Sequence, residues 1–367
     1  MIDRLLRYCE AAKLSIGAER DFLSTAKVWI RRGRPAGRVN CFSVAPTVIA
    51  SWTGALHYTD DESELNLPPV LPVPLCSTMN AESLKLIVLT GSNRPEVHAA
   101  WQELLPYLNR TDGVEVVGEY SRSDDIAGRV EADIVVVLGG DGSILRGCRQ
   151  LGRHQIPIIG INLGQLGFLA HLTLEEFRGN LDQLRRGEYE VAEYLMFECT
   201  HRFADGSTQT ESGLNEITIT SASSLEMVDV SLEIDGQPVT TFSCDGLIIS
   251  TPVGSTAHNL SAGGPILRQD LQAFCITPIC PHTLTVRPIV DTADRIYSLS
   301  IGEARDGAVL VIDGQIRRPV SVGDRVTVRR ADSTFKQVQF PGHSYYSTLH
   351  RKLGWRGQLD YRNPRGR

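Results

Sequence analysis

The sequence of 367 residues lacks the features of several protein classes. It contains no run of about 18 apolar residues, which excludes a transmembrane helix. Its eight cysteines include no Cys-x-x-Cys pair, so we expect free, buried thiols and a reducing, cytoplasmic location. An excess of positive charge is also missing, because 37 Lys and Arg residues against 43 Asp and Glu residues give a net charge of −6. Broad binding to nucleic acid or to an anionic membrane is therefore not expected.

Further signatures are absent as well. The sequence has no G-x-x-x-x-G-K-[ST] motif, which excludes a P-loop. It has no protein-kinase catalytic loop followed by Asp-Phe-Gly at the required spacing. The first residues of the chain interrupt each apolar stretch with charge, so they do not resemble a secretory signal.

The order of the predicted elements after residue 80 indicates an α/β domain. Four apolar runs have the composition of strands: 84–90, 114–120, 133–140 and 156–164. Helices are predicted between them over 94–109 and from Ser143, and an amphipathic stretch follows at 173–187. Strands that alternate with helices favour a parallel sheet with right-handed crossovers. We assign residues 81–187 to this N-terminal α/β domain.

After residue 187 the apolar residues recur with period two, which is typical of antiparallel strands. The predicted strands are 216–221, 227–239, 246–251, 282–290, 297–302, 308–315 and 325–330. Asp-Gly pairs that begin at Asp235 and Asp313 indicate hairpin turns. Residues 188–340 are therefore predicted to form a mainly antiparallel, all-β second domain, and residues 341–367 a C-terminal segment that returns to the first domain.

Residues 1–80 have no periodic apolar pattern long enough to predict a stable element, and they stay unassigned. Residues 1–40 are rich in arginine, and residues 51–80 carry only acidic charges before a proline-dense run. Three interpretations remain open: translation that starts at or near Met79, a disordered regulatory tail, and an organelle-targeting sequence. The acidic residues among the first 40 argue against the last of these.

The sequence GGDGS (139–143) lies where a predicted parallel strand ends and a helix begins, the position at which open α/β sheets bind ligands. Gly139, Gly140 and Gly142 let the backbone approach a phosphate, and a helix N-terminus favours negative charge. Asp141 is unusual there, because a carboxylate beside a phosphate is repelled unless it holds a metal or accepts a proton from an attacking hydroxyl. The alternative is an ordinary strand–turn–helix loop with Asp141 as the helix N-cap.

Three other segments carry small or paired polar residues. GINLGQLGF (160–168) lacks the third glycine of a dinucleotide fingerprint and is interpreted as a tight turn. Asn215 and Glu216, at the start of a predicted strand, can hydrogen-bond the vicinal hydroxyls of a ribose or form a solvated strand end. DGLIISTPVGSTAHNLSAGGPIL (245–267) combines a buried strand with small residues that leave space beside backbone amides, as a flat base and its ribose require.

In this order and spacing, these segments resemble the NAD kinase family. The resemblance covers about 84–355 and includes ITPICPHTL (276–284) and LHRKLGW (349–355). The combination of GGDG with STPxGSTA is specific, whereas GGDG alone also occurs in diacylglycerol and sphingosine kinases. The resemblance implies transfer of a phosphoryl group from ATP to the 2′-hydroxyl of the adenosine ribose of NAD, with a divalent metal, Mg²⁺, as cofactor. It also implies a homodimer or homotetramer with pocket contacts from a neighbouring subunit.

The same resemblance implies roles for individual residues. Asp141 accepts the proton of the 2′-hydroxyl, and the phosphates lie against its neighbouring glycines, Gly139, Gly140 and Gly142. The residues implied to bind NAD are Asn215, Glu216, Ser243, Asp245, Val253, Thr256, Ala257, His258, Asn259, Leu260, Ser261, Cys280 and Gln315. Asp245 contacts the nicotinamide end, and 256–261 hold the adenosine. No metal ligand is assigned.

Three positions depart from the family pattern. Val253 stands where Thr or Ser is usual, His258 where Tyr is usual, and Ser243 where many members carry a basic residue. None of them is the expected base, so affinity and the choice between NAD and NADH are affected more than the reaction. Two alternatives from other classes remain. A GGDG-type lipid kinase is disfavoured by the polar STPVGSTAHNLSAGG segment, and a non-catalytic NAD-binding regulator is disfavoured by the presence of Asp141.

Overall fold

The structure is a computed structural model, in which the chain divides into two compact units between Ser77 and Thr78. It describes the backbone of residues 14–20, 26–32 and 40–44 in the first unit, and residues 83–354 in the second. Within the second unit it leaves out residues 92–93, 123, 125, 127, 129–130, 165–166, 224–225, 303–306 and 342–343.

The first unit contains an antiparallel sheet in the order β1–β2–β3. Its strands are β1 (Leu14–Arg20), β2 (Ala26–Arg32) and β3 (Asn40–Val44). The sequence predicted no regular element here, because the alternation in AKVWIRR and its neighbours is too short to stand out from the charged surroundings. The tail, targeting and start-site interpretations fall on the rest of residues 1–80, which lies outside the described residues.

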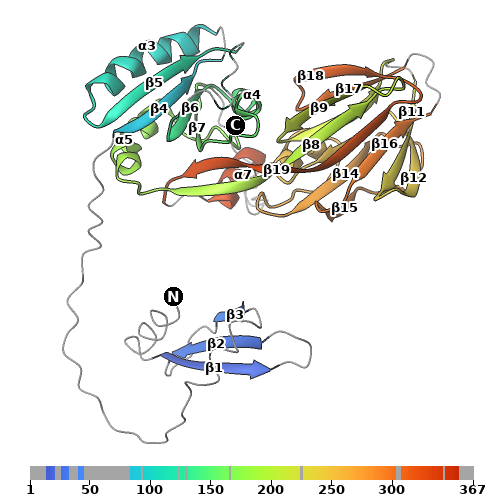
Figure 1. Ribbon diagram of the computed structural model, residues 1–367, viewed down its shortest axis with the longest axis horizontal. Helices are drawn as coiled ribbons and strands as arrows, with labels where there is room; N and C mark the ends of the chain where they lie inside the picture. Colours follow the sequence, from blue (N-terminus) through green and yellow to red (C-terminus); the bar gives the residue numbers. More distant parts are fainter. Residues whose placement is uncertain are drawn as a thin grey trace, which may run out of the picture. The chain divides into compact units, whose positions relative to one another are not determined.

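The second unit begins with the predicted parallel sheet (Figure 1). Its strands, in spatial order, are β5 (Val114–Tyr120), β4 (Leu84–Leu89), β6 (Ile134–Leu138) and β7 (Ile158–Ile161). Helices α3 (Pro95–Arg110) and α5 (Leu174–Arg185) cover one face, and α4 (Asp141–Leu151) packs on the other. The α/β domain is confirmed. Helix α4 begins at Asp141 rather than at Ser143, and its N-cap is Gly140, so the N-cap alternative for Asp141 is wrong.

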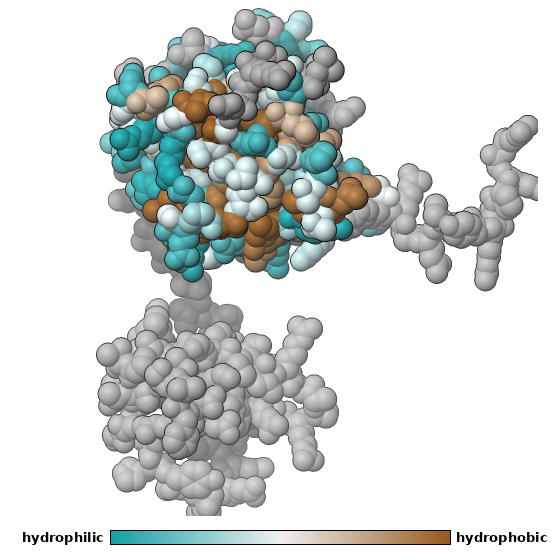
Figure 2. Space-filling view, turned by 90° about the vertical axis from the view of Figure 1, so that its right-hand side faces the viewer, coloured by the Kyte–Doolittle hydropathy of each residue, from teal (hydrophilic) through white to brown (hydrophobic). Residues whose placement is uncertain are grey.

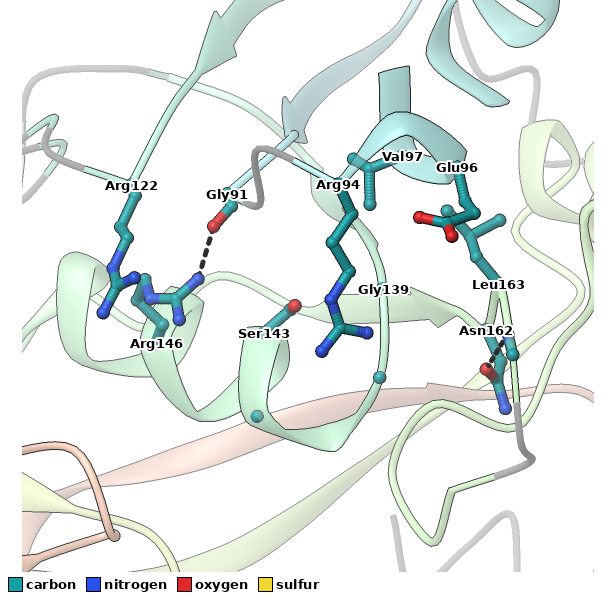
Figure 3. Close-up of a pocket in the computed structure, with 13 residues that line it drawn as sticks. Gly91, Arg94, Glu96, Val97, Arg122, Gly139, Ser143, Arg146, Asn162 and Leu163 are labelled. Atoms are coloured by element: carbon teal, nitrogen blue, oxygen red, sulfur yellow. Dashed lines mark hydrogen bonds between the residues drawn. The ribbon is translucent and has the colours of Figure 1, made fainter. Parts of the chain in front are cut away.

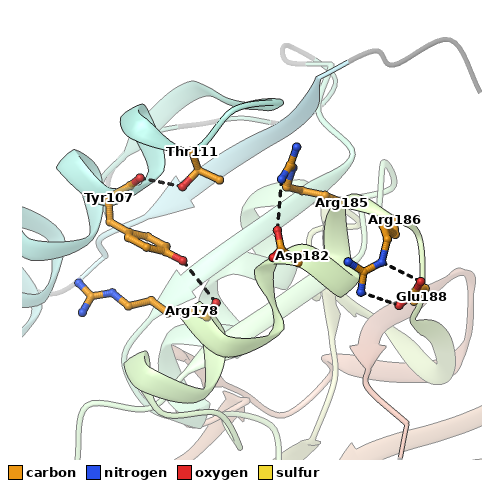
Figure 4. Close-up of polar contacts among 7 residues, drawn as sticks. All are labelled: Tyr107, Thr111, Arg178, Asp182, Arg185, Arg186 and Glu188. Atoms are coloured by element: carbon orange, nitrogen blue, oxygen red, sulfur yellow. Dashed lines mark hydrogen bonds and ion pairs between the residues drawn. The ribbon is translucent and has the colours of Figure 1, made fainter.

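Helices α3 and α5 also contact each other (Figure 4). The Tyr107 hydroxyl donates to the Arg178 carbonyl at 3.4 Å, and the Arg178 guanidinium donates to Glu103 at 2.8 Å. Helix α5 starts with a capping box, in which Thr173 and Glu176 each bond the other's backbone amide at 3.1 and 2.7 Å. These contacts anchor α5 and therefore the loop that precedes it, which enters the site described below.

Strand β19 (Arg325–Gln339) joins the parallel sheet to the second domain. Near its C-terminal end Gln337 pairs with Ile158 of β7 in parallel, and most of its length is antiparallel to β8 (Glu190–Arg202). The sheet then continues through β16 (Tyr297–Ile301), β11 (Val228–Ile234) and β12 (Gln237–Cys244), while β9 (Thr208–Gly213) pairs with β8. One continuous sheet therefore spans both domains.

A separate antiparallel sheet completes the second domain. Its strands, in spatial order, are β15 (Ile289–Thr292), β14 (Ala273–Ile279), β13 (Gly246–Ser250), β10 (Glu216–Ser221), β17 (Ala308–Ile312) and β18 (Ile316–Val320). Apolar side chains from both sheets, among them Phe197, Ile249 and Leu299, form one buried cluster. The antiparallel second domain is confirmed. Both hairpin turns are confirmed too, because Asp235 and Asp313 have φ angles of 51° and 48°.

Some strands differ from the predictions. In the second unit the sequence missed β8, β9, β14 and β18, and residues 282–288 are not a strand. Strands β8 and β14 contain continuous buried runs, so they lack the alternation that marks a half-exposed strand. In residues 282–288, Arg287 donates to the carbonyls of Leu284 and Val286 at 2.8 and 2.7 Å. A side chain, rather than a neighbouring strand, therefore supplies the hydrogen bonds of these carbonyl groups.

The last described helix contacts two other parts of the second unit. In helix α7 (Tyr345–Leu353), Tyr345 donates to the Leu267 carbonyl at 3.1 Å, and the Lys352 ammonium lies 5.7 Å from the centre of the Phe168 ring.

Figure 2 shows apolar and polar residues interspersed on one face. No helix of the described residues is long and apolar enough to span a membrane. The five cysteines whose side chains the structure describes are free, and of these Cys280 is exposed.

Candidate active site

A cavity of about 730 Å³ opens at the carboxyl edge of the parallel sheet (Figure 3). Gly91, Gly139 and Asn162, which follow strands β4, β6 and β7, line it. Arg146 of α4 donates to the Gly91 carbonyl across this edge. Open α/β sheets bind ligands at this edge, so the fold puts a cavity where the sequence predicted a site.

The GGDGS loop forms one wall of the cavity. Gly139 has a φ of 139°, which a residue with a side chain rarely adopts. A Cβ at Gly140 or Gly142 would meet no atom within 4 Å, so this backbone is open to a ligand. Helix α4 begins at the same point, and the first amides of a helix are free to donate to an anion. The wall therefore suits a phosphate group.

Three arginines that the sequence analysis did not single out also line the cavity (Figure 3). They are Arg94, Arg122 and Arg146, and Glu96 adds a carboxylate. Burial and the positive charges of Arg122 and Arg149 lower the pKa of Arg146. Positive charges gathered beside a helix N-terminus favour a polyanion. The arginines come from separate loops and a helix and share no local motif, so only the fold brings them together.

Asp141 is held by the loop that follows β7. Its carboxylate accepts hydrogen bonds from the amides of Phe168 (2.8 Å), Leu169 (3.1 Å) and Ala170 (2.8 Å). A Cβ at Gly167 would lie 1.9 Å from the carboxylate, so this position requires glycine. An ionised carboxylate offers about four acceptor positions, which leaves about one for a ligand hydroxyl. The sequence predicted the turn but not its contact with Asp141.

The segments around Asn215 and after β13 lie against each other. The Thr251 amide donates to the Asn215 carbonyl at 2.9 Å. A Cβ at Gly254 would lie 2.2 Å from the same carbonyl oxygen, so only glycine lets the chains approach this closely. Glu216 accepts a hydrogen bond from the backbone amide of His258. The structure thus joins two segments that the sequence analysis selected separately.

Glu216 at the start of β10 and Asp313 in the turn after β17 are two buried carboxylates. Glu216 is 6% exposed, and its Oε2 has no hydrogen-bond partner in the described part of the chain. Burial and the negative charge of Asp313 raise the pKa of Glu216 to about 8. Asp313 accepts hydrogen bonds from the amides of Leu214 (2.9 Å), Asn215 (2.8 Å) and Glu216 (3.1 Å). From the sequence, Asp313 was expected only to form a turn, so its contacts with the Asn215 segment were missed.

Gln315 connects the two halves of the site. Its Nε2 donates to the Gly142 carbonyl at 2.8 Å, and its Oε1 accepts from Arg149 at 2.8 Å. The phosphate loop, the turn after β17 and the Asn215 segment therefore form one connected group.

Two residues expected to bind NAD are buried within the protein. Val253 is 2% exposed and belongs to an apolar cluster that includes Leu214. Asn259 is fully buried, with its amide nitrogen donating to the Pro265 carbonyl at 3.0 Å and its oxygen accepting from Thr277 at 2.6 Å. Both side chains support the loop. The other expected residues of this loop are at least partly exposed: Thr256, Ala257, His258, Leu260 and Ser261.

Three further expected residues lie at the opposite end of β13. Asp245 precedes this strand and Thr251 follows it, so at about 3.4 Å per residue they are about 20 Å apart. Ser243 donates to Asp229, and the carboxylate of Asp245 raises the pKa of the hydrogen-bonded Cys280 thiol. Within one copy of the chain, Ser243, Asp245 and Cys280 do not join the rest of the site.

Comparison with known proteins identifies the family. The ATP-NAD kinase N-terminal domain matches residues 118–189, and the ATP-NAD kinase C-terminal domain matches residues 214–340. The NAD kinase of Rhodopirellula baltica is 42% identical over 278 residues, which cover 76% of this chain and 89% of that protein. The chain belongs to the NAD kinase family. The NAD kinase of Geotalea daltonii is 41% identical over 235 residues, which cover 64% of this chain and 82% of that protein.

Solved structures agree with the fold of an NAD kinase. An NAD kinase from Archaeoglobus fulgidus in complex with ATP is 29% identical, with a TM-score of 0.56 over 74% of this chain and 98% of that one. Yeast NADH kinase complexed with NADH has the same fold, with 24% identity and a TM-score of 0.70 over 76% of this chain and 90% of that one. The two family domains divide the site, since the phosphate loop lies in the first and Asn215 and Gln315 in the second.

Proposed function

We propose that the chain transfers the γ-phosphoryl group of ATP to the 2′-hydroxyl of the adenosine ribose of NAD, with Asp141 as the general base. Membership of the NAD kinase family makes it an enzyme that forms NADP from NAD. The observation that carries the finer proposal is the carboxylate of Asp141, which three amides hold beside the phosphate loop with about one acceptor position left.

The cavity supports ATP as the phosphoryl donor. Its glycine wall, helix N-terminus and three arginines offer donors and positive charge to a triphosphate. The relative from Archaeoglobus fulgidus was solved with ATP. Because phosphoryl transfer depends mainly on alignment and on charge stabilisation, Arg94, Arg122 and Arg146 hold and neutralise the phosphates.

Asn215, Glu216 and Asp141 act on the ribose. The raised pKa of Glu216 means that this side chain holds a proton over part of the neutral range, so it can donate to a ribose oxygen. A ribose hydroxyl is a weak acid, and a positioned base contributes about 10²–10⁴-fold to the rate. Asp141 therefore takes the proton as the hydroxyl oxygen attacks the γ-phosphorus and ADP leaves.

A divalent metal ion would enter the site bound to the phosphates of ATP. Within the described residues no group of three or more His, Cys, Asp or Glu side chains is placed to hold a metal ion. This fits Mg²⁺, which commonly binds through substrate phosphates and one or two carboxylates while keeping several waters. Glu96 is the carboxylate that lines the cavity, and it would face such an ion. When bound, Mg²⁺ neutralises charge that develops on the transferred phosphoryl group.

A second copy of the chain completes the NAD site. The support for this is the separation of about 20 Å between Asp245 and the Thr251 end of β13, together with exposed apolar side chains at the edge of the six-stranded sheet. Leu284 is 89% exposed, and Val290 on the edge strand β15 is 48% exposed. A homodimer or homotetramer would bury these side chains and bring Asp245 of one copy to the cavity of another.

Incubation of the protein with ATP, Mg²⁺ and NAD, with NADP measured directly, tests the reaction. The expected result is one NADP for each ATP consumed, and no phosphorylation when diacylglycerol replaces NAD. Binding of NAD without turnover would favour a regulator and contradict the proposal, and phosphorylation of the lipid alone would favour a lipid kinase. Light scattering at working concentration tests the oligomer, which a monomer with full activity would contradict.

A further inference from the structure

We propose that Arg149 and Gln315 form a positioning bracket between two parts of the site. The bracket fixes the phosphate loop (139–143) against the ribose-binding strand, which is β10 together with Asn215. This inference rests on the proposed function, because it assigns the bracket to the same site. Neither residue is needed for the chemistry itself. Each acts by holding Asp141 and Asn215 at the distance that transfer requires.

Gln315 lies alongside helix α4 and contacts both of its ends. Gly142, which accepts from Nε2, is in the first turn of the helix, and Arg149, which donates to Oε1, is in the last turn. The helix rises about 1.5 Å per residue, so these two positions are about 10 Å apart along its axis. With both ends of its amide engaged, Gln315 fixes the orientation of the helix that carries Asp141.

Arg149 is suited to hold Gln315 rather than a ligand. It does not line the cavity, and its Nη1 is buried without a hydrogen-bond partner in the described part of the chain. Its positive charge favours the ionised form of Asp313, two residues before Gln315, although burial raises the pKa of that carboxyl. The guanidinium therefore joins the helix to the turn, and it does not lie among the residues that line the cavity.

Asp313 connects the turn that contains Gln315 to the Asn215 segment in the other half of the site. Its carboxylate accepts three amide hydrogen bonds from Leu214, Asn215 and Glu216, and its own amide donates to the Glu216 carbonyl at 2.9 Å. The turn also closes on itself, because the Gln315 amide donates to the Ile312 carbonyl at 2.9 Å. A displacement of α4 therefore displaces the ribose-binding strand, and a displacement of that strand displaces α4.

A bracket and a ligand contact predict different kinetics. Loss of a residue that only binds NAD raises KM for NAD and leaves kcat unchanged. Loss of a residue that aligns bound substrates lowers kcat, since a misplacement of about 1 Å can cost about 10²-fold. The two roles of Gln315 can thus be separated by measurement.

The test replaces the polar groups with side chains of similar length. Gln315→Met and Arg149→Met are expected to lower kcat by about 10-fold to 10²-fold, with KM for NAD and for ATP within about threefold of wild type. The double variant is expected to be no slower than the slower single variant, because the two residues act through one contact. Arg153→Met, at an exposed position just beyond the same helix, is the matched control and is expected to keep full activity.

Gln315→Glu keeps the test informative if Arg149→Met does not fold. The carboxylate still pairs with Arg149 but cannot donate to Gly142, so kcat is expected to fall as in Gln315→Met while the melting temperature stays close to wild type. The bracket is overturned if Arg149→Met retains at least half of the wild-type kcat, if Gln315→Met changes only KM for NAD, or if the two effects multiply in the double variant. Wild-type protein that forms no NADP would overturn the proposed function and the bracket with it.

Discussion

Asp141 uses one carboxylate for the proposed reaction and for the shape of the loop above it. In Asp141→Asn one oxygen remains, while the new NH₂ group faces an amide donor of residues 168–170. We expect kcat for NADP formation to fall by about 10²-fold or more, because the base is lost. We also expect the free energy of unfolding to fall by about 1–3 kcal/mol, because one amide loses its acceptor. Steady-state kinetics and urea denaturation measure the two effects.

Asp182→Asn is the matched control, since this side chain is 70% exposed on α5 and distant from the phosphate loop in sequence. It is expected to leave both quantities unchanged. Retention of more than about a third of the wild-type kcat by Asp141→Asn would contradict the assignment of the base. Unchanged stability would contradict the hydrogen bonds of the loop.

Glu216 predicts a dependence of stability on pH. Its pKa is raised to about 8, above the ordinary value of 4.5, by burial and by Asp313. The folded chain therefore keeps a proton that the unfolded chain releases above about pH 4.5, and the stability present below that pH is lost as the pH rises toward 8. The slope is about 1.4 kcal/mol per pH unit. Glu216→Gln, which keeps the size and does not titrate, should match wild type near pH 5 and be more stable above pH 8.

Denaturation of both proteins from pH 5 to pH 9 measures this difference, and Glu175→Gln at an exposed position of α5 is the control. The control is expected to show a difference that does not change over this range. A Glu216→Gln difference that is equally constant would mean that Glu216 is ionised throughout, and its proposed donation to the ribose would fall.

At the scale of elements, the loop after β13 depends on one glycine. A Cβ at Gly254 would lie 2.2 Å from the Asn215 carbonyl oxygen, so Gly254→Ala must push this loop away from the ribose-binding strand. We expect KM for NAD to rise at least tenfold and the melting temperature to fall. Gly179→Ala is the matched control, because a Cβ at that helical position meets nothing within 4 Å. It should raise stability by about 0.5–1 kcal/mol, and equal effects of the two variants would contradict the close approach.

Some features of the elements around the site could be predicted from the sequence, and others could not. The GGDGS loop could be predicted, because a strand, glycines and a helix start follow one another locally. Arg94, Arg122 and Arg146 could not, since their meeting depends on where three elements end in space. The role of Asp313 was hidden for a similar reason: its partners are about a hundred residues away in the chain. The burial of the Val253 side chain could not be predicted either, because a family pattern names a position and does not say whether the side chain faces inward.

At the scale of the whole molecule, β19 determines which parts of the chain work together. It pairs with β7 of the parallel sheet and with β8 and β16 of the second domain, so a single strand joins the two domains in one sheet. The separate sheet, which positions Asn215 and Gln315, packs against β19 through the buried cluster that contains Ile217 and Val328. The Arg149–Gln315 contact also joins the two domains, because it connects helix α4 of the first to the turn after β17 of the second. Both devices belong to the second unit.

The second unit is therefore expected to work without the first. The three apolar clusters of the described residues take all their members from 84–340, and the two family domains match within 118–340. The match to the Rhodopirellula baltica NAD kinase spans 76% of this chain and 89% of that protein, so a region of this size accounts for most of a relative.

A truncated protein of residues 79–367 should therefore melt within about 5 °C of the full chain and retain kcat/KM for NAD within about twofold. The change leaves every described contact of the site in place, because the boundary between the units falls between Ser77 and Thr78. Thermal denaturation and NADP formation by both proteins, at equal concentration so that any oligomer is compared fairly, measure the effect. A truncation to 110–367, which removes β4 and α3 from the parallel sheet, is the positive control and should not fold. A larger drop in melting temperature, or a tenfold loss of activity in 79–367, would mean that the first unit contributes to the working enzyme.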